Sequence, residues 1–219
     1  EPRQTLALLR REMPGLQTPR QTAEAWSATG QAQLLADRPA EAAESFAASR
    51  QADPAWSGAE EAFFLTGQAQ MKAGNRDAAA DIWKDLIRQA PDGPLADRAR
   101  YRLGQTASQA GRFEEAIDYF SPVVTATAGG SPLQPFARYA KGWAEMQSDN
   151  FSQAIETLTP LAEQRPGHPL TDDAMLARGI SHRNQRQYQK AREDLERFLA
   201  TAEPDTPASP NGPDNLLRP

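Results

Sequence analysis

The side chains that could support catalysis or hold a metal ion are few in this chain of 219 residues. It contains two histidines, His168 and His182, and no cysteine, which excludes thiol nucleophiles, disulfides and Cys-ligated metal centres. Ser181 precedes His182, but adjacent residues on a helix point about 100° apart, and the surrounding Gly-Ile-Ser-His-Arg lacks the second glycine of a nucleophile elbow. We therefore predict that the chain is not an enzyme and needs neither a cofactor nor a metal.

The other polar patterns have structural explanations. Acidic pairs such as Asp172-Asp173 stand where helices are expected to begin, and the helix dipole stabilises negative charge there. His168 lies in a Pro-Gly-His-Pro turn and is expected in solvent. His182 is expected on a helix as a large, half-buried packing residue. None of these groups indicates chemistry.

Composition and charge limit the possible partners. Hydrophobic residues make up 39% of the chain and charged residues 24%, which is typical of a globular protein. The 29 acidic residues outnumber the 24 basic ones, giving a net charge of -5, so the chain as a whole does not attract nucleic acid or anionic lipid. Because no run of 18 apolar residues occurs, we predict no direct membrane insertion and no nucleic-acid partner.

The main sequence signal is an internal repeat with a period near 37 residues. Glycine recurs at Gly30, Gly67, Gly104, Gly142 and Gly179. Twelve residues after each glycine stands an alanine, at Ala42, Ala79, Ala116, Ala154 and Ala191. Four residues further comes a bulky apolar side chain, at Phe46, Trp83, Phe120, Leu158 and Leu195.

Each copy of the repeat divides at a short turn into two helical segments. Residues 113–120 and 188–199, for example, carry apolar residues at steps of three and four with charged residues opposite, and strand alternation is missing. Pro54, Pro91 and Pro166 end the second segment. We expect the repeated glycine and alanine to let the two helices approach closely, while the bulky residue fills the space toward the next pair.

The order and spacing of these positions resemble the tetratricopeptide repeat (TPR), as shown by Trp26, Gly30, Ala42, Phe46 and Pro54 in the first copy. The resemblance implies an all-α fold, a right-handed α-α superhelix of about five helix-turn-helix repeats after an N-terminal helix. The expected repeats are 23–59, 60–96, 97–134, 135–171 and 172–203. Residues 1–22 are expected to form a helix and linker, either a partial preceding repeat or a separate cap, and residues 204–219 a Pro-rich disordered tail.

The linkers between copies suggest a cellular setting. The copies are about three residues longer than the usual 34, and linkers such as 91–97 and 166–172 read Pro-x-x-Pro-Leu-x-Asp. Such linkers look like those of bacterial envelope TPR proteins of the Tol-Pal-associated and outer-membrane assembly lipoprotein type. This resemblance implies a periplasmic or cell-envelope location, with the cytoplasm as the alternative. The lipidated N-terminal cysteine of those lipoproteins is missing.

The family pattern also implies a binding surface, because the first helices of TPR pairs line a concave groove. Carried onto this sequence, the groove residues expected to bind a protein or peptide are Phe64, Gln68, Arg98, Tyr101, Gln105, Tyr139 and Trp143. Aromatic rings offer contact area at low entropic cost, and amides can satisfy the backbone of a bound strand. The alternatives are that the rings are partly buried between neighbouring first helices and that Arg98 is simply solvated.

We therefore predict a non-enzymatic scaffold for protein-protein interaction, acting in a bacterial cell-envelope assembly. The alternative is the TPR portion of a larger modular protein, such as an enzyme or a secretion or polysaccharide-export component, whose chemistry lies outside this chain. Leu195 and Phe198, near the end of the last copy, also suggest self-association through the terminal repeat, since repeat arrays need covered ends.

Overall fold

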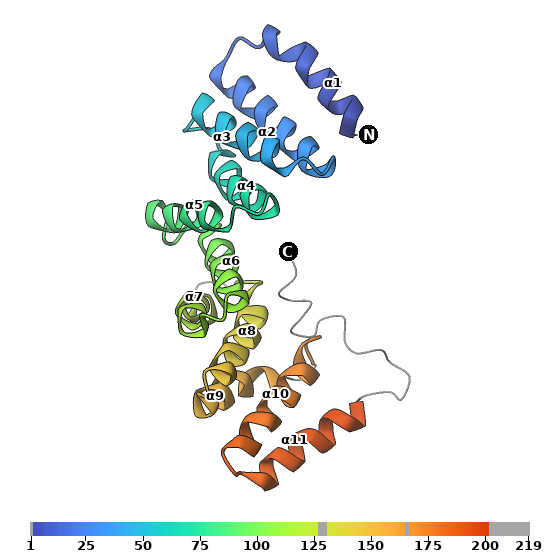
Figure 1. Ribbon diagram of the computed structural model, residues 1–219, viewed down its shortest axis with the longest axis vertical. Coiled ribbons are helices and arrows are strands. Elements are labelled where there is room, and N and C mark those ends of the chain that lie inside the picture. Colours follow the sequence, from blue (N-terminus) through green and yellow to red (C-terminus); the bar gives the residue numbers. More distant parts are fainter. Residues whose placement is uncertain (1, 127–130, 165–166, 202–219) are drawn as a thin grey trace. The chain divides into compact units, whose positions relative to one another are not determined.

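The computed structural model describes residues 2–126, 131–164 and 167–201. Within these ranges every regular element is a helix, which confirms the all-α fold. The helices are α1 (Pro2–Glu12), a short 3-10 helix (Met13–Gly15), α2 (Pro19–Leu35), α3 (Pro39–Ala52), α4 (Ala59–Lys72), α5 (Arg76–Gln89), α6 (Ala96–Gln109), α7 (Phe113–Thr125), α8 (Gln134–Gln147), α9 (Phe151–Ala162), α10 (Thr171–Asn184) and α11 (Tyr188–Thr201) (Figure 1). None of them is long and apolar enough to cross a membrane. Pro166 and the predicted tail at 204–219 lie outside the described residues.

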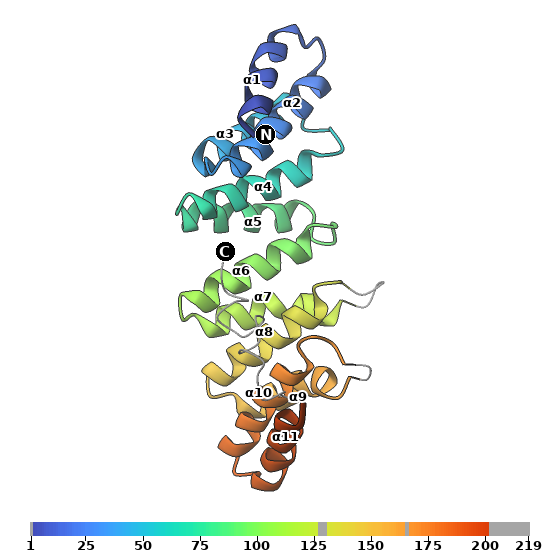
Figure 2. The ribbon, with the colours of Figure 1, turned by 90° about the vertical axis from the view of Figure 1, so that its right-hand side faces the viewer.

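The helices form pairs, α2 with α3 and so on to α10 with α11, and we call the first helix of each pair helix A and the second helix B. The chain divides into two compact units, the first ending at Ala99 and the second beginning at Arg100. In the first unit successive helices contact one another from α1 through α5, and in the second unit from α7 through α11. In the second unit the A helices α8 and α10 also touch directly. Figure 2 shows this successive stacking within each unit.

One backbone arrangement closes the turn inside every pair. A residue with positive φ stands at the same place in all five turns, at Asp37, Gly74, Gly111, Asp149 and Arg186. The next residue then donates its N–H to a carbonyl five residues earlier, as from Arg38 to Gln33 and from Gln187 to His182, both at 2.9 Å. This is the Schellman ending of a helix. It ends each helix A where the sequence predicts a turn, although three of the five residues are not glycine.

The repeated glycines make room for the repeated bulky side chains of their own pair. A Cβ atom on Gly67 would lie 2.4 Å from Nε1 of Trp83, and one on Gly104 would lie 2.5 Å from the ring of Phe120. The Trp83 indole also donates to the carbonyl of Phe64 at 3.3 Å. The bulky residue also packs toward the next pair, as expected, since Phe46 shares a core cluster with Ala69 and Phe120 shares one with Ala137.

The N-terminal helix expected within residues 1–22 is present as α1, which contacts α2 and buries Leu6. The chain then enters α2 through a capping box. The Thr18 hydroxyl accepts from the Gln21 N–H, and the Gln21 side chain accepts from the Thr18 N–H, both at 3.2 Å. Pro19 occupies the first helical turn, where its missing N–H costs nothing.

Candidate functional site

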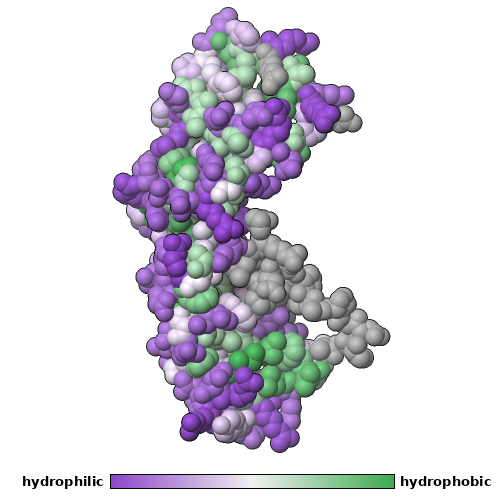
Figure 3. Space-filling view, viewed as in Figure 1, coloured by the Kyte–Doolittle hydropathy of each residue, from purple (hydrophilic) through white to green (hydrophobic). Residues whose placement is uncertain are grey.

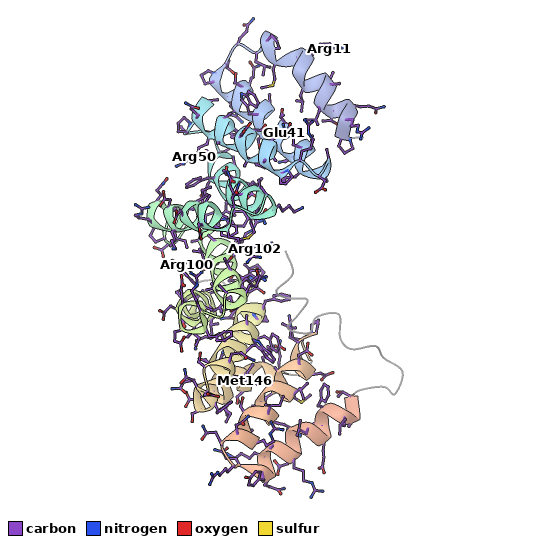
Figure 4. All side chains as sticks on the ribbon, in the orientation of Figure 1. Arg11, Glu41, Arg50, Arg100, Arg102 and Met146 are labelled. Carbon is purple, nitrogen blue, oxygen red and sulfur yellow. The ribbon has the colours of Figure 1, made fainter. Side chains whose placement is uncertain are left out.

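Helix A of the fourth and fifth pairs presents an apolar surface in the second unit. Phe136, Tyr139 and Trp143 follow one another on α8 at intervals of three and four, so they share one helix face. Tyr139 is buried, whereas Phe136, Trp143 and Ile180 of α10 are only partly buried against the same core cluster. Met146, labelled in Figure 4, belongs to that cluster as well. Of the residues expected from the sequence, Trp143 is thus placed where a ligand can reach it.

Tyr139, expected in the groove with burial between first helices as the alternative, lies in the core. The residue is 3% exposed. Burial, together with the nearby Asp173 carboxylate, raises the pKa of its hydroxyl above the ordinary value. Burial and the neighbouring Asp172 also raise the pKa of Asp173, whose Oδ2 has no hydrogen-bond partner among the described residues.

Tyr101 and Gln105, also expected in the groove, are buried on α6 as well. The Tyr101 ring packs against Phe120 with centroids 5.7 Å apart. Burial raises the pKa of the Tyr101 hydroxyl to about 12, against a smaller opposing effect of Arg102. Gln105 accepts a hydrogen bond from Nη1 of Arg102 at 3.1 Å. Both side chains therefore support the fold instead of facing a ligand.

In the first unit Phe64 is buried beneath an arginine. The ring is 1% exposed, and the Arg98 guanidinium lies 4.4 Å from its centroid. Arg98 also forms an ion pair with Glu61 at 3.2 Å. The ring expected to bind a ligand is thus covered, and Arg98, expected either to bind an acidic ligand or to be solvated, has an acidic partner within the chain. Gln68, which lies on α4 with Phe64, remains partly exposed.

An ionic network joins the end of α9 to α10 and α11, with Arg178 and Asp194 buried and the Glu163 side chain 60% exposed. Arg178 donates through Nη1 to Glu163 at 2.9 Å and through Nε and Nη2 to Asp194. His182 is also buried, as a packing residue, and its Nδ1 lies 2.8 Å from Oε1 of Gln187. The sequence gives no sign of this network, because Glu163, Arg178 and Asp194 are 15 or more residues apart and form no recognisable motif.

His168 has a more defined place than the solvated turn expected for it. Its Nδ1 accepts from the Leu170 N–H at 3.2 Å. Its ring meets Phe136 edge to face, with centroids 5.4 Å apart. These contacts join the linker before α10 to the apolar surface on α8, so His168 helps to position Phe136.

A second feature missed from the sequence is a cavity of about 470 Å³ among α3, α4 and α5 in the first unit. Arg50, labelled in Figure 4, lies over the Phe63 ring at 3.8 Å and donates to Gln89 at 2.7 Å. The cavity is lined by Ala47, Arg50, Gln51, Pro54, Phe63, Thr66 and Ile82. It contains none of the seven residues expected to bind a partner.

Comparison with known proteins agrees with this architecture. No curated protein shows significant similarity to the sequence. Among solved structures, MamA from Desulfovibrio magneticus RS-1 is 17% identical with a TM-score of 0.65, the match covering 82% of this chain and 94% of that one. YrrB, a TPR protein with an unusual peptide-binding site, is 18% identical with a TM-score of 0.64, covering 84% and 87%. The C-terminal part of a TPR repeat-containing protein from Cytophaga hutchinsonii is 14% identical with a TM-score of 0.73, covering 89% and 72%.

At these identities the solved structures show a shared fold, and the resemblance to envelope lipoproteins stays a prediction. The model of the tetratricopeptide repeat matches residues 64–131 and 139–213, which is more than half of the chain. The chain therefore belongs to the tetratricopeptide repeat family.

Proposed function

We propose that this chain is a protein-binding scaffold whose surface on helices α8 and α10 takes a peptide or protein segment through Trp143. The partly buried Trp143, which packs against the same buried core as Phe136 and Ile180, is the observation that carries the proposal. Tryptophan is enriched among residues that dominate binding energy, because its large ring buries much area with few rotatable bonds.

The core beneath Trp143 supports this role. Tyr139 and Met175 are nearly fully buried, so the platform is held by packing before a ligand arrives. A preformed surface loses little conformational entropy on binding. YrrB, which shares the fold, has a peptide-binding site, and we propose the same class of ligand here.

In the first unit we propose only a minor polar contribution to binding. Gln68 offers an amide at the surface of α4. The ion pair between Arg98 and Glu61 is about half exposed, and solvated pairs of this kind contribute little energy. Trp143 is therefore expected to matter more than Arg98 or Gln68.

The test starts from peptides selected from a displayed library on the immobilised full chain. The affinity of a selected peptide is then measured for the parent chain and for two variants with unchanged thermal unfolding. Trp143→Ala is expected to weaken binding about tenfold or more. Tyr188→Ala, which removes a ring that is 65% exposed at the start of helix B α11, is the matched control. If the selected peptide binds both variants with equal affinity, the proposal is wrong.

We also propose a bacterial cell-envelope setting, which the linker resemblance supports. Antibody detection in fractions of the producing cells tests it. Recovery in the periplasmic or membrane-associated fraction is expected, and recovery only in the cytoplasmic fraction would overturn it. The alternative, that these repeats serve a larger modular protein, keeps the same binding role and changes only the neighbouring modules.

A further inference from the structure

The last helix pair exposes a face that the inner pairs cover. The bulky helix-B residue is at most 1% exposed in the first four pairs, at Phe46, Trp83, Phe120 and Leu158. Its counterpart in the last pair, Leu195, is partly exposed. The bulky residue therefore has the same place in the repeat but less cover at the end of the array.

The positions three and four residues further along helix B show the same contrast. In α9, Leu161 and Ala162 are 2% and 1% exposed. In α11, Phe198 is partly exposed and Leu199 is 67% exposed. Figure 3 shows hydrophobic surface over α10 and α11 on the side that faces the viewer. We call Leu195, Phe198 and Leu199 the terminal face.

In the second unit a helix A with small side chains covers this face on α7 and on α9. The α8 helix packs on α7 through alanines that belong to the same core cluster as Phe120 and Val123, and α10 packs on α9 in the same way. The covering residues stand at i, i+3 and i+7, as Ala137, Ala140 and Ala144 on α8 and as Ala174, Ala177 and Ser181 on α10. Small residues at this spacing allow the two helices to approach closely.

We propose that the terminal face binds an amphipathic helix of another protein, one that carries small residues at i, i+3 and i+7. Such a helix would continue the stacking interface that α8 and α10 already make with the preceding helix B. The proposal goes beyond the surface around Trp143, because it concerns helix B of the last pair and a different class of ligand.

Two observations favour a helix from a different protein. Prolines recur every three residues at positions 204, 207, 210 and 213, so the sequence of residues 202–219 does not predict a further helix of the length of α8. A second copy would bring its own terminal face, and two faces of large side chains lack the small stripe that allows close packing.

The probe is a fluorescent peptide of residues 131–149, which contains α8, the helix that covers the equivalent face of α7. Anisotropy is measured while the full chain is added. Saturable binding is expected, and Leu199→Glu should weaken it about tenfold or more, because a carboxylate would be buried under the helix. The matched control is Leu35→Glu, at a leucine that is 77% exposed at the end of α2, and it should change the affinity less than about twofold. A peptide carrying Ala140→Glu and Ala144→Glu should not bind.

Several results would overturn the proposal. One is the absence of saturable binding, and another is equal binding by the Leu199→Glu chain. Sedimentation that shows a dimer dissociated by Leu199→Glu would mean that a second copy covers the face, the self-association suggested by the sequence. Binding by a chain ending at residue 201 but not by the full chain would mean that the chain's own tail covers it.

Discussion

Arg178 and Asp194 form a bidentate ion pair between α10 and α11, with Nε to Oδ2 at 2.8 Å and Nη2 to Oδ1 at 2.7 Å. Both side chains are buried. Burial alone would lower the pKa of Arg178, but the hydrogen bonds to Asp194 and Glu163 outweigh it and raise that pKa. The guanidinium therefore stays charged and depends on its carboxylate partners.

The first prediction concerns this pair. Asp194→Ala leaves a buried cation without its main partner and should lower the free energy of unfolding by about 3–5 kcal/mol, whereas replacing both residues with Arg178→Met and Asp194→Leu should recover much of the loss. Urea unfolding of the two variants and the parent chain measures this. A loss below about 1 kcal/mol for Asp194→Ala would show that the pair is solvated.

The second prediction concerns the glycine beside Trp83. Gly67→Ala places a Cβ atom 2.4 Å from the indole nitrogen, so Trp83 must move and its hydrogen bond to the Phe64 carbonyl is strained. We expect a loss of about 1–3 kcal/mol in unfolding free energy, despite the better helix propensity of alanine. Gly15→Ala, with no atom within 4 Å of its Cβ, is the control. Equal thermal stability of the two variants would contradict the packing described for Trp83.

The third prediction uses the turn before α11. Arg186 has a φ of 57°, a left-handed conformation that costs free energy in a residue with a side chain. Arg186→Gly should therefore raise the free energy of unfolding by about 0.5–1 kcal/mol. Asp149→Gly, at the equivalent turn, should gain less because aspartate tolerates this conformation. Thermal unfolding of the two variants and the parent chain measures these changes. A destabilised Arg186→Gly chain would contradict the claim that the left-handed conformation of Arg186 costs free energy.

The fourth prediction follows from the Tyr101 pKa of about 12. Above pH 10 the unfolded chain ionises this tyrosine while the folded chain keeps its proton, so the folded state loses stability as the pH rises from 10 to 12. At pH 11 the loss from this residue is about 1.4 kcal/mol. Urea unfolding at pH 9 and pH 11 should show a smaller decrease for Tyr101→Phe than for the parent chain. The same decrease in both would place the hydroxyl in solvent.

The repeat period was enough to predict the helix pairs, the five turns and the buried bulky side chains of the first four copies. The family pattern placed Phe64 and Tyr139 in the groove, but both rings are buried. It could not give the depth of these rings, because depth depends on how closely successive A helices lie and on neighbours such as Arg98 that cover a ring.

The ionic network could not be predicted from the sequence either, because it too depends on which residues of neighbouring helices face each other. The position of Arg178 varies among the copies, which hold Thr29, Thr66, Leu103 and Lys141 there, so the repeat pattern does not predict its partner. Its meaning appears only when the facing position on α11 is seen to hold Asp194, 16 residues away.

Hydrogen exchange of the full chain with and without a selected peptide tests the central claim most directly. If the surface around Trp143 binds the ligand, exchange should slow in α8 near Trp143 and in α10 near Ile180, while α9 and α11 stay unchanged. Slower exchange confined to helix B segments, or no change in α8 and α10 at saturating peptide, would contradict it.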